Sequence, residues 1–178
     1  MRLFSAGHFL DAELCAQIRK AIDAGEVEPA EVLTESGGAF PSDDVRRAAS
    51  VEVDEATLAF VEVTLEESKE ALSSFFGLEL ATREGPGFLA YGPHGFYKPH
   101  RDRAVSDAWP DAARRQLTIV LFLNDDLRGG ELRLLPDDED PLVVPPTTGT
   151  LIAFDAGIVH EVLPVLDGRR YTVVDWWC

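Results

Sequence analysis

The spacing of hydrophobic positions along the chain changes near residue 79. Before that point they recur every three or four residues, which is the spacing of one helix face. Beyond it they form short apolar runs separated by Gly, Pro and Asp, which is typical of strands joined by turns. The sequence therefore predicts helices in the first part of the chain and a β-rich core in the second.

Two helices are predicted in the first part. The first follows Asp11, whose side chain suits a helix N-cap, and its apolar residues are spaced by four. The second runs from about Glu55 to Phe76, and Gly77 stands where a helix often ends in the left-handed conformation. Residues 25–50 lose this periodicity, so we predict a loop with at most one short strand there.

The second part of the chain predicts short strands with Gly, Pro and Asp turns between them, a pattern that indicates a sandwich or jelly-roll barrel. Segments 124–130 and 136–141 are predicted hairpin connections, and the acidic run in the latter is interpreted as a solvated turn rather than a cation site. The strands are predicted at Phe88–Tyr91, Phe96–Asp102, Gln116–Asn124, Glu131–Leu135, Leu142–Val144, Thr150–Phe154, His160–Leu163 and Tyr171–Trp177.

Length and charge limit the function. A chain of 178 residues suits one domain, with residues 1–80 supplying helices and a loop and residues 81–178 the β core. A net charge of -16 argues against binding to nucleic acid or to an anionic membrane. No apolar run is long enough to span a bilayer, and no secretory signal is evident. Cys15 and Cys178 form no CxxC pair, so we expect a reducing, cytoplasmic setting.

One short stretch concentrates side chains that bind metals. On an extended strand, His100 and Asp102 point to the same side, which pairs an imidazole with a carboxylate. A second imidazole would complete the set of two His and one carboxylate that suits non-haem Fe(II). His160 is the candidate, because it stands between two apolar runs, whereas His8 precedes the first helix and His94 lies in a predicted turn.

The order of motifs after residue 88 resembles the prolyl 4-hydroxylase-like branch of the 2-oxoglutarate and Fe(II)-dependent dioxygenases. The resemblance covers residues 88–178, and motifs in a fixed order are far more specific than any one of them. The motifs are His100-x-Asp102, Arg115 leading into Leu117–Asn124, Gly129–Leu132, His160–Pro164 and Arg169–Tyr171.

The resemblance implies a mainly β fold with flanking helices, in which a double-stranded β-helix, a jelly-roll or cupin-like barrel, is supported by N-terminal helices. It implies Fe(II) bound by His100, Asp102 and His160, and 2-oxoglutarate chelating that iron. Arg170 is the match for the basic residue that grips the distal carboxylate of 2-oxoglutarate, and a guanidinium suits that task. Arg169 points to the other face of its strand.

Further residues are implied with less specific roles. Thr172 and Trp176 share the face of Arg170, so the first is expected to bind the same carboxylate and the second to line the cavity near the substrate. Tyr91 is expected to offer a hydrogen bond in the pocket, and Arg115 to contact the substrate. Phe122 departs from the family pattern, because many prolyl hydroxylases have a Tyr there whose hydroxyl also meets the distal carboxylate.

The implied reaction hydroxylates an unactivated C–H bond while 2-oxoglutarate and O2 become succinate and carbon dioxide, with ascorbate left open as a further cofactor. A prolyl residue in a peptide or protein is the leading substrate, and residues 25–50 and 103–114 are expected to wall the site. The same chemistry on a free amino acid or small metabolite is the alternative. A β-barrel module that binds without turnover, and a metal-dependent hydrolase or isomerase, are the rivals from other classes.

Overall fold

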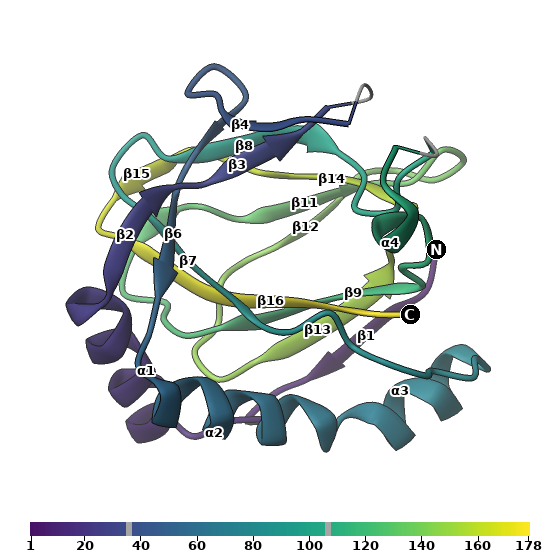
Figure 1. The fold of residues 1–178 in the computed structure, drawn as a ribbon, viewed down its shortest axis with the longest axis horizontal. Coiled ribbons are helices and arrows are strands. Elements are labelled where there is room, and N and C mark those ends of the chain that lie inside the picture. The colour runs from purple at the N-terminus through teal and green to yellow at the C-terminus, as the bar shows by residue number, and fades with distance from the viewer. Residues whose placement is uncertain (35–36, 106–107) are drawn as a thin grey trace.

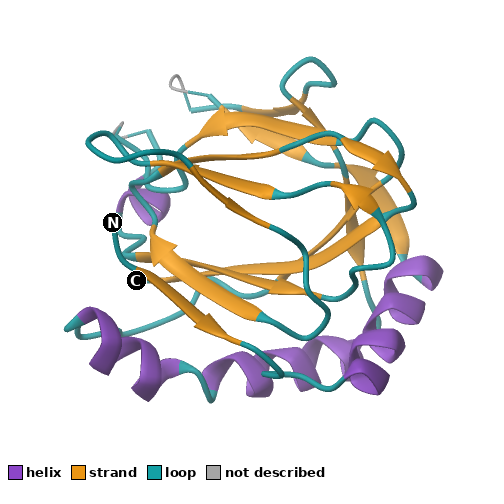
Figure 2. Ribbon diagram, turned by 180° about the vertical axis from the view of Figure 1, so that it is seen from behind, coloured by secondary structure: helices purple, strands orange, loops and turns teal. Residues whose placement is uncertain are grey.

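Two antiparallel sheets face each other, and helices lie along the outer face of the larger sheet (Figures 1 and 2). The computed structural model describes residues 1–34, 37–105 and 108–178. Residues 35–36 and 106–107 belong to the two segments predicted to wall the site, and they lie outside the described residues. The arrangement confirms the predicted mainly β fold with flanking helices and its jelly-roll core.

Within the described residues, the larger sheet has the strand order β1-β13-β9-β16-β7-β6-β2, and the smaller sheet has the order β12-β11-β14-β8-β5. The neighbouring strands within each of these sheets are all antiparallel. The larger sheet comprises β1 (Leu3–Ala6), β13 (Leu151–Asp155), β9 (Leu117–Phe122), β16 (Arg170–Trp177), β7 (Gly87–Tyr91), β6 (Ala49–Glu52) and β2 (Glu26–Pro29). The smaller comprises β12 (Leu142–Val144), β11 (Leu132–Leu135), β14 (Val159–Val162), β8 (Phe96–His100) and β5 (Arg46–Arg47). Two strand pairs stand apart, β3 (Glu31–Leu33) with β4 (Ala39–Pro41) and β10 (Arg128–Gly129) with β15 (Val165–Asp167).

The first predicted helix is confirmed and the second is divided. Helix α1 (Ala12–Ala24) begins after Asp11, whose carboxylate accepts a hydrogen bond from the Leu14 amide at 2.8 Å. The second helix becomes α2 (Glu55–Glu66) and α3 (Lys69–Phe76), because Ser68 turns its amide and its hydroxyl back onto the carbonyl of Leu65. A short α4 (Pro110–Ala113) was not predicted. No helix among the described residues has the length and apolar character needed to cross a bilayer.

The prediction of a loop at residues 25–50 is wrong. This segment contains β2 to β5 and the start of β6, and β6 extends the larger sheet by pairing with β7. Strand β2 lies at the edge of that sheet with every residue exposed. An edge strand without a buried face has no alternating apolar pattern, so the sequence could not reveal it.

All of the predicted strands after residue 81 are confirmed within one or two residues at their ends. The hairpin predicted at 136–141 is confirmed, because β11 pairs with β12. The hairpin predicted at 124–130 is wrong: β9 lies in the larger sheet and β11 in the smaller one, so this segment crosses between the sheets. On the way it forms β10, which pairs with β15.

Alternation along the central strands creates two separate cores. In β9, Ile119 and Leu121 pack in the core beneath the helices, whereas Val120 and Phe122 pack between the two sheets. Strand β16 alternates in the same way, so its even-numbered residues face the space between the sheets. That space holds the candidate site.

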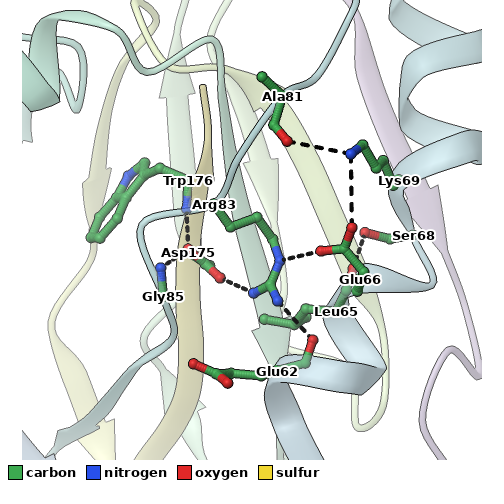
Figure 3. A network of polar contacts seen from close by, with 10 residues as sticks. All are labelled: Glu62, Leu65, Glu66, Ser68, Lys69, Ala81, Arg83, Gly85, Asp175 and Trp176. Carbon is green, nitrogen blue, oxygen red and sulfur yellow. Dashed lines mark hydrogen bonds and ion pairs between the residues drawn. The ribbon is translucent and has the colours of Figure 1, made fainter.

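An ion-pair network anchors the outer face of β16 to the helices (Figure 3). Arg83 pairs with the fully buried Asp175 of β16, and its other nitrogens reach Glu66 of α2 and the carbonyl of Glu62. Asp175 also accepts hydrogen bonds from the backbone amides of Gly85 and Trp176. The network therefore fixes the strand that carries Arg170 and Trp176.

Candidate metal and 2-oxoglutarate site

The structure brings together the three residues predicted to bind a metal. His100 at the end of β8 is the direct cross-strand partner of His160 in β14. The Nε2 atom of His100 lies 3.6 Å from Oδ1 of Asp102, and Nε2 of His160 lies 3.4 Å from Oδ2. Among the described residues this is the one His, Cys or carboxylate cluster whose candidate ligand atoms all lie within 4.8 Å. The set is the facial one of two His and one carboxylate that suits Fe(II).

Backbone carbonyls set the orientation of both imidazoles. Nδ1 of His100 lies 2.9 Å from the carbonyl oxygen of Lys98, and Nδ1 of His160 lies 3.0 Å from that of Ile158. Because a carbonyl only accepts, each Nδ1 carries the proton and donates it. In the neutral form of each ring, Nε2 then has a free lone pair on the side of the common centre, as a metal ligand requires.

Asp102 lies beyond the end of strand β8 and is positioned by hydrogen bonds instead. Strand β8 ends at His100, so the simple alternation of a strand does not place Asp102. Its amide instead donates to the carbonyl of Ala156 at 3.1 Å, and its Oδ2 accepts a hydrogen bond from the Thr118 hydroxyl at 2.7 Å. Thr118 was missed by the sequence analysis, although it lies on the same face of β9 as Val120.

The side chains of His100, Asp102 and His160 shift one another's pKa values. Burial and, after it, the neighbouring His160 lower the pKa of His100 to about 3, so this imidazole is neutral. Burial, the largest single effect, raises the pKa of Asp102, but its neighbours, His160 first and then His100, together hold that pKa well below the usual range. Burial likewise opposes the charged form of His160, yet Asp102 raises its pKa. An ionised carboxylate next to a neutral imidazole is the state that binds a cation.

Arg170 is a buried cation in the same region. Its side chain lies between the sheets, only 2% of the residue is exposed, and burial lowers its pKa to about 10. Nη1 donates to Oγ1 of Thr172 at 3.1 Å, while Nε is buried with no acceptor. No carboxylate pairs with it in the part of the chain that the structure describes. Arg169, by contrast, pairs with Asp23 of α1 on the outer face.

One cavity of about 280 Å³ joins the three metal-binding candidates to Arg170. The predicted residues Tyr91, Arg115 and Trp176 also line it. Thr172 is fully buried and does not line it, so its hydroxyl orients Arg170 instead of reaching into the cavity. Phe122 lies against Arg170, with its ring centre 5.4 Å from the guanidinium carbon, and offers no hydroxyl.

Arg115 is held tightly at the edge of this cavity. Its guanidinium pairs with Glu84, with both N···O distances at 2.6 Å, and lies 3.8 Å from the ring centre of Trp176. Its Nη1 also donates to the backbone carbonyl of Asp102 at 3.1 Å. Its charge is therefore already compensated, and its position supports the segment that carries Asp102.

Part of the cavity wall comes from the first half of the chain, where the sequence predicted a segment but no individual residues. Arg46 of β5 and residues 31–33 of β3 line the cavity. Tyr97 of β8 lines it too and stacks on His100, with ring centres 3.5 Å apart. Burial raises the pKa of Tyr97 to about 12. Part of segment 25–50 therefore borders the site as predicted, whereas none of the described residues of 103–114 lines the cavity. Residues 35–36 and 106–107 lie outside the described residues.

Residues 86–178 match the family model described as the 2OG-Fe(II) oxygenase superfamily, which is just over half of the chain. The chain belongs to this superfamily. It is 33% identical over 91 residues to a PKHD-type hydroxylase of Maricaulis maris, which is 49% of this chain but 36% of that protein. It is 26% identical over 195 residues to prolyl 4-hydroxylase 1 of Arabidopsis thaliana, covering 98% of this chain and 68% of that protein. The chain thus spans about a third of the first relative and two thirds of the second.

Solved structures give the same result for the fold. A prolyl-4-hydroxylase of Pseudomonas putida superposes with a TM-score of 0.74 and 28% identity, covering 98% of this chain and 91% of that one. A prolyl hydroxylase of Trichoplax adhaerens, solved with a peptide fragment of hypoxia inducible factor, superposes with a TM-score of 0.79 at 18% identity. It covers 98% of this chain and 82% of its own, and at that identity it shows the fold alone.

The residues present fit the cofactors that this superfamily uses, Fe(II) with 2-oxoglutarate and O2. The two Nε2 lone pairs and the ionised carboxylate are the ligand set that Fe(II) takes when positions are kept open. Arg170 lines the same cavity, and its guanidinium, whose buried Nε has no acceptor among the described residues, matches a carboxylate group.

Proposed function

We propose that this protein is an Fe(II)- and 2-oxoglutarate-dependent dioxygenase that hydroxylates an unactivated C–H bond. One observation carries the proposal: Arg170, a buried guanidinium with no counter-ion among the described residues, shares a cavity with His100, Asp102 and His160. A metal site alone would also suit a hydrolase or isomerase. A second, anion-binding position beside the metal is what a dicarboxylate co-substrate needs.

The residues take distinct roles in this proposal. His100, Asp102 and His160 bind the metal, and Thr118 holds the Asp102 carboxylate in place. Arg170, oriented by Thr172 and flanked by Tyr91, binds the distal carboxylate of 2-oxoglutarate. When bound, iron supplies the activation of O2 that is coupled to the conversion of 2-oxoglutarate to succinate and carbon dioxide.

The remaining cavity residues exclude water and orient the substrate. Val120, Leu132 and Val162 give the cavity an apolar wall, which keeps water away from the reacting carbon. Trp176 and Arg115 form a rigid stacked pair at its edge, which limits where a substrate can enter. The chain's own contribution is therefore positioning and desolvation, while the cofactor supplies the oxidation.

We infer that the substrate is a prolyl residue in a peptide or protein. The support is the whole-chain similarity to prolyl hydroxylases of Arabidopsis thaliana and Pseudomonas putida, at 26% and 28% identity. We also infer a single domain, because the helices share one core with the larger sheet. Cytoplasmic action is our further inference, supported by the unpaired thiols of Cys15 and Cys178.

The test is turnover with Fe(II), 2-oxoglutarate and prolyl-containing peptides, with succinate and peptide mass as readouts. We expect succinate to form together with a peptide that is heavier by one oxygen atom, and both to vanish in His160→Ala. A matched control is His94→Ala, whose side chain lies in an exposed turn away from the cavity. Turnover that survives His160→Ala, or that proceeds without O2, would contradict the proposal.

A further inference from the structure

A second guanidinium reaches the cavity from the smaller sheet. Arg46 in β5 is the cross-strand partner of Tyr97 in β8, and its guanidinium carbon lies 4.6 Å from the centre of the Tyr97 ring. Tyr97 in turn stacks on His100, with the ring planes only 17° apart. This stack of three side chains connects Arg46 to a proposed metal ligand and fixes its position beside the reaction centre.

The charge of Arg46 is not compensated. No acidic side chain pairs with it within residues 1–34, 37–105 and 108–178. Its Nη1 donates to the backbone carbonyl of Glu31 at 3.0 Å, and its Nε is buried with no acceptor. Of the other arginines at the cavity edge, Arg115 pairs with Glu84 and Arg101 with Asp137. In a chain with a net charge of -16, a cavity arginine without an acidic partner is a feature that needs a reason.

We propose that Arg46 binds a carboxylate of the primary substrate. This deepens the proposed function and rests on it. The carboxylate can come from an acidic side chain next to the hydroxylated residue of a peptide, or from the α-carboxylate of a free amino acid. Both present the planar pair of oxygens that a guanidinium binds with two parallel hydrogen bonds.

The cavity is lined by two guanidinium groups that have no acidic partner in the described part of the chain, those of Arg46 and Arg170, which would suit two anionic groups on bound ligands. Arg46 and Arg170 lie close enough to repel each other, since Arg46 contributes to the lowered pKa of Arg170 after the effect of burial. One dicarboxylate co-substrate reaching Arg170 leaves Arg46 without a partner, because Arg46 belongs to the opposite sheet and lies over the Tyr97 ring, which stacks on the metal-binding imidazole of His100. A carboxylate on the substrate would neutralise it and would bring the substrate to the metal side of the cavity.

The neighbouring residue provides a matched control. Arg47 follows Arg46 in the same strand and turns to the other face, where its guanidinium lies 5.7 Å from the Phe96 ring centre. It lines a separate surface groove and does not line the site cavity. Arg46→Gln and Arg47→Gln therefore remove the same charge from adjacent positions, only one of which faces the site.

The experiment compares these variants on three peptides that differ by Glu, Gln or Lys beside the target proline, and on free proline. We expect the wild type to favour either the Glu peptide or free proline over the Gln peptide by roughly ten- to hundred-fold in kcat/KM. Which of the two is favoured identifies the source of the carboxylate. Arg46→Gln should lose this preference and Arg47→Gln keep it, while KM for 2-oxoglutarate stays unchanged in both. Arg46→Glu should favour the Lys peptide.

Two outcomes would overturn the inference. One is an active wild type that treats the Glu, Gln and Lys peptides alike and ignores free proline. The other is an Arg46→Gln variant in which KM for 2-oxoglutarate rises, because Arg46 would then serve the co-substrate. If no substrate is turned over, the proposed function fails, and binding of the same peptides to the metal-loaded protein decides the role of Arg46: equal binding of all three rejects it, and a Glu preference lost in Arg46→Gln supports it.

Discussion

The guanidinium of Arg170 is buried between the sheets with one side-chain hydrogen bond and no acidic partner among the described residues. A buried charge without a partner costs stability, because water no longer solvates it. A protein retains such a group when a ligand supplies the missing counter-charge. The same reasoning applies to Arg46, whose Nε is also buried without an acceptor.

Replacing Arg170 should lower the affinity for 2-oxoglutarate without lowering the stability of the fold. We expect Arg170→Met to weaken 2-oxoglutarate binding by about a hundred-fold, because the distal carboxylate loses its ionic partner. The ligand-free variant should melt at the same temperature or higher, since an apolar side chain removes an unpaired buried charge. Calorimetric titration without O2 and thermal melting measure the two effects. Arg169→Met is the control, and unchanged 2-oxoglutarate affinity in Arg170→Met would contradict the assignment.

Replacing Thr118 should lower the affinity of the site for its metal. We expect Thr118→Val to lower metal affinity by roughly ten- to hundred-fold, because the Asp102 carboxylate loses the hydroxyl that orients it. Metal titration followed by fluorescence or calorimetry measures the change. Thr64→Val removes a hydroxyl that donates to the carbonyl of Phe60 in its own helix, so metal affinity should not change in that control. Equal metal affinity in both variants would mean that Thr118 does not position Asp102.

Residues in motifs could be predicted, whereas residues placed by strand pairing could not. His100, Asp102, His160 and Arg170 have recognisable types in a recognisable order. Arg46 lies far away in sequence, and it reaches the cavity only because β5 pairs with β8. No local pattern signals that pairing, since β5 is two residues long and lies at the edge of its sheet.

At the scale of elements, strand β16 carries different chemistry on its two faces. Arg170 and Trp176 on its inner face line the cavity. Asp175 on its outer face pairs with Arg83, which also pairs with Glu66 of α2 (Figure 3). Burial raises the pKa of Asp175, and the nearby Arg83 opposes that rise. The network therefore determines how firmly the strand that bears the anion-binding residue is held.

Removing Arg83 should destabilise the fold in a pH-dependent way. At neutral pH we expect Arg83→Met to lower the free energy of unfolding by about 3–5 kcal/mol, because Asp175 stays buried and ionised without its cation. A group whose pKa is raised by folding favours the folded state when protonated, so this loss should shrink as the pH falls below the raised pKa of Asp175. Denaturant unfolding at several pH values measures the trend.

The exposed pair of Arg114 and Asp111 provides the comparison for that experiment. Arg114→Met should change the free energy of unfolding little at any pH, because both partners are solvated. The double variant Arg83→Met with Asp175→Asn should recover part of the stability lost in Arg83→Met. A loss in Arg83→Met that stays constant with pH would mean that Asp175 is not the group left unpaired.

Elements with a buried face were predictable and edge elements were not. Strand β9 is buried on both faces and reads as an apolar run broken only by Thr118, so its position was evident. The break between α2 and α3 depends on a side-chain hydrogen bond from Ser68, which the apolar stripe running through both helices does not reveal.

At the scale of the whole molecule, the site lies between two sheets that contribute different parts. The smaller sheet supplies His100 and His160, and the larger one supplies Thr118 and Arg170. A metal with its dicarboxylate would therefore connect the two sheets. Ligands that bind only the folded state raise its stability in proportion to the logarithm of their concentration over the dissociation constant.

Ligand binding should therefore be visible as thermal stabilisation. We expect a redox-inert divalent metal to raise the melting temperature and 2-oxoglutarate to raise it further only when that metal is present. At a concentration of about a hundred times the dissociation constant, each ligand should add about 2.7 kcal/mol to the free energy of unfolding. Succinamide, which lacks both carboxylates, is the control ligand. Stabilisation by 2-oxoglutarate without metal would contradict a site in which both bind together.

The central claim is that His100, Asp102 and His160 hold one metal ion. The most direct measurement is the metal content of the protein after anaerobic loading with Fe(II) and removal of the excess, for the wild type and for His100→Ala, Asp102→Ala and His160→Ala. We predict one iron per chain in the wild type and its loss in each of the three variants. One iron per chain in any of the three would contradict the claim.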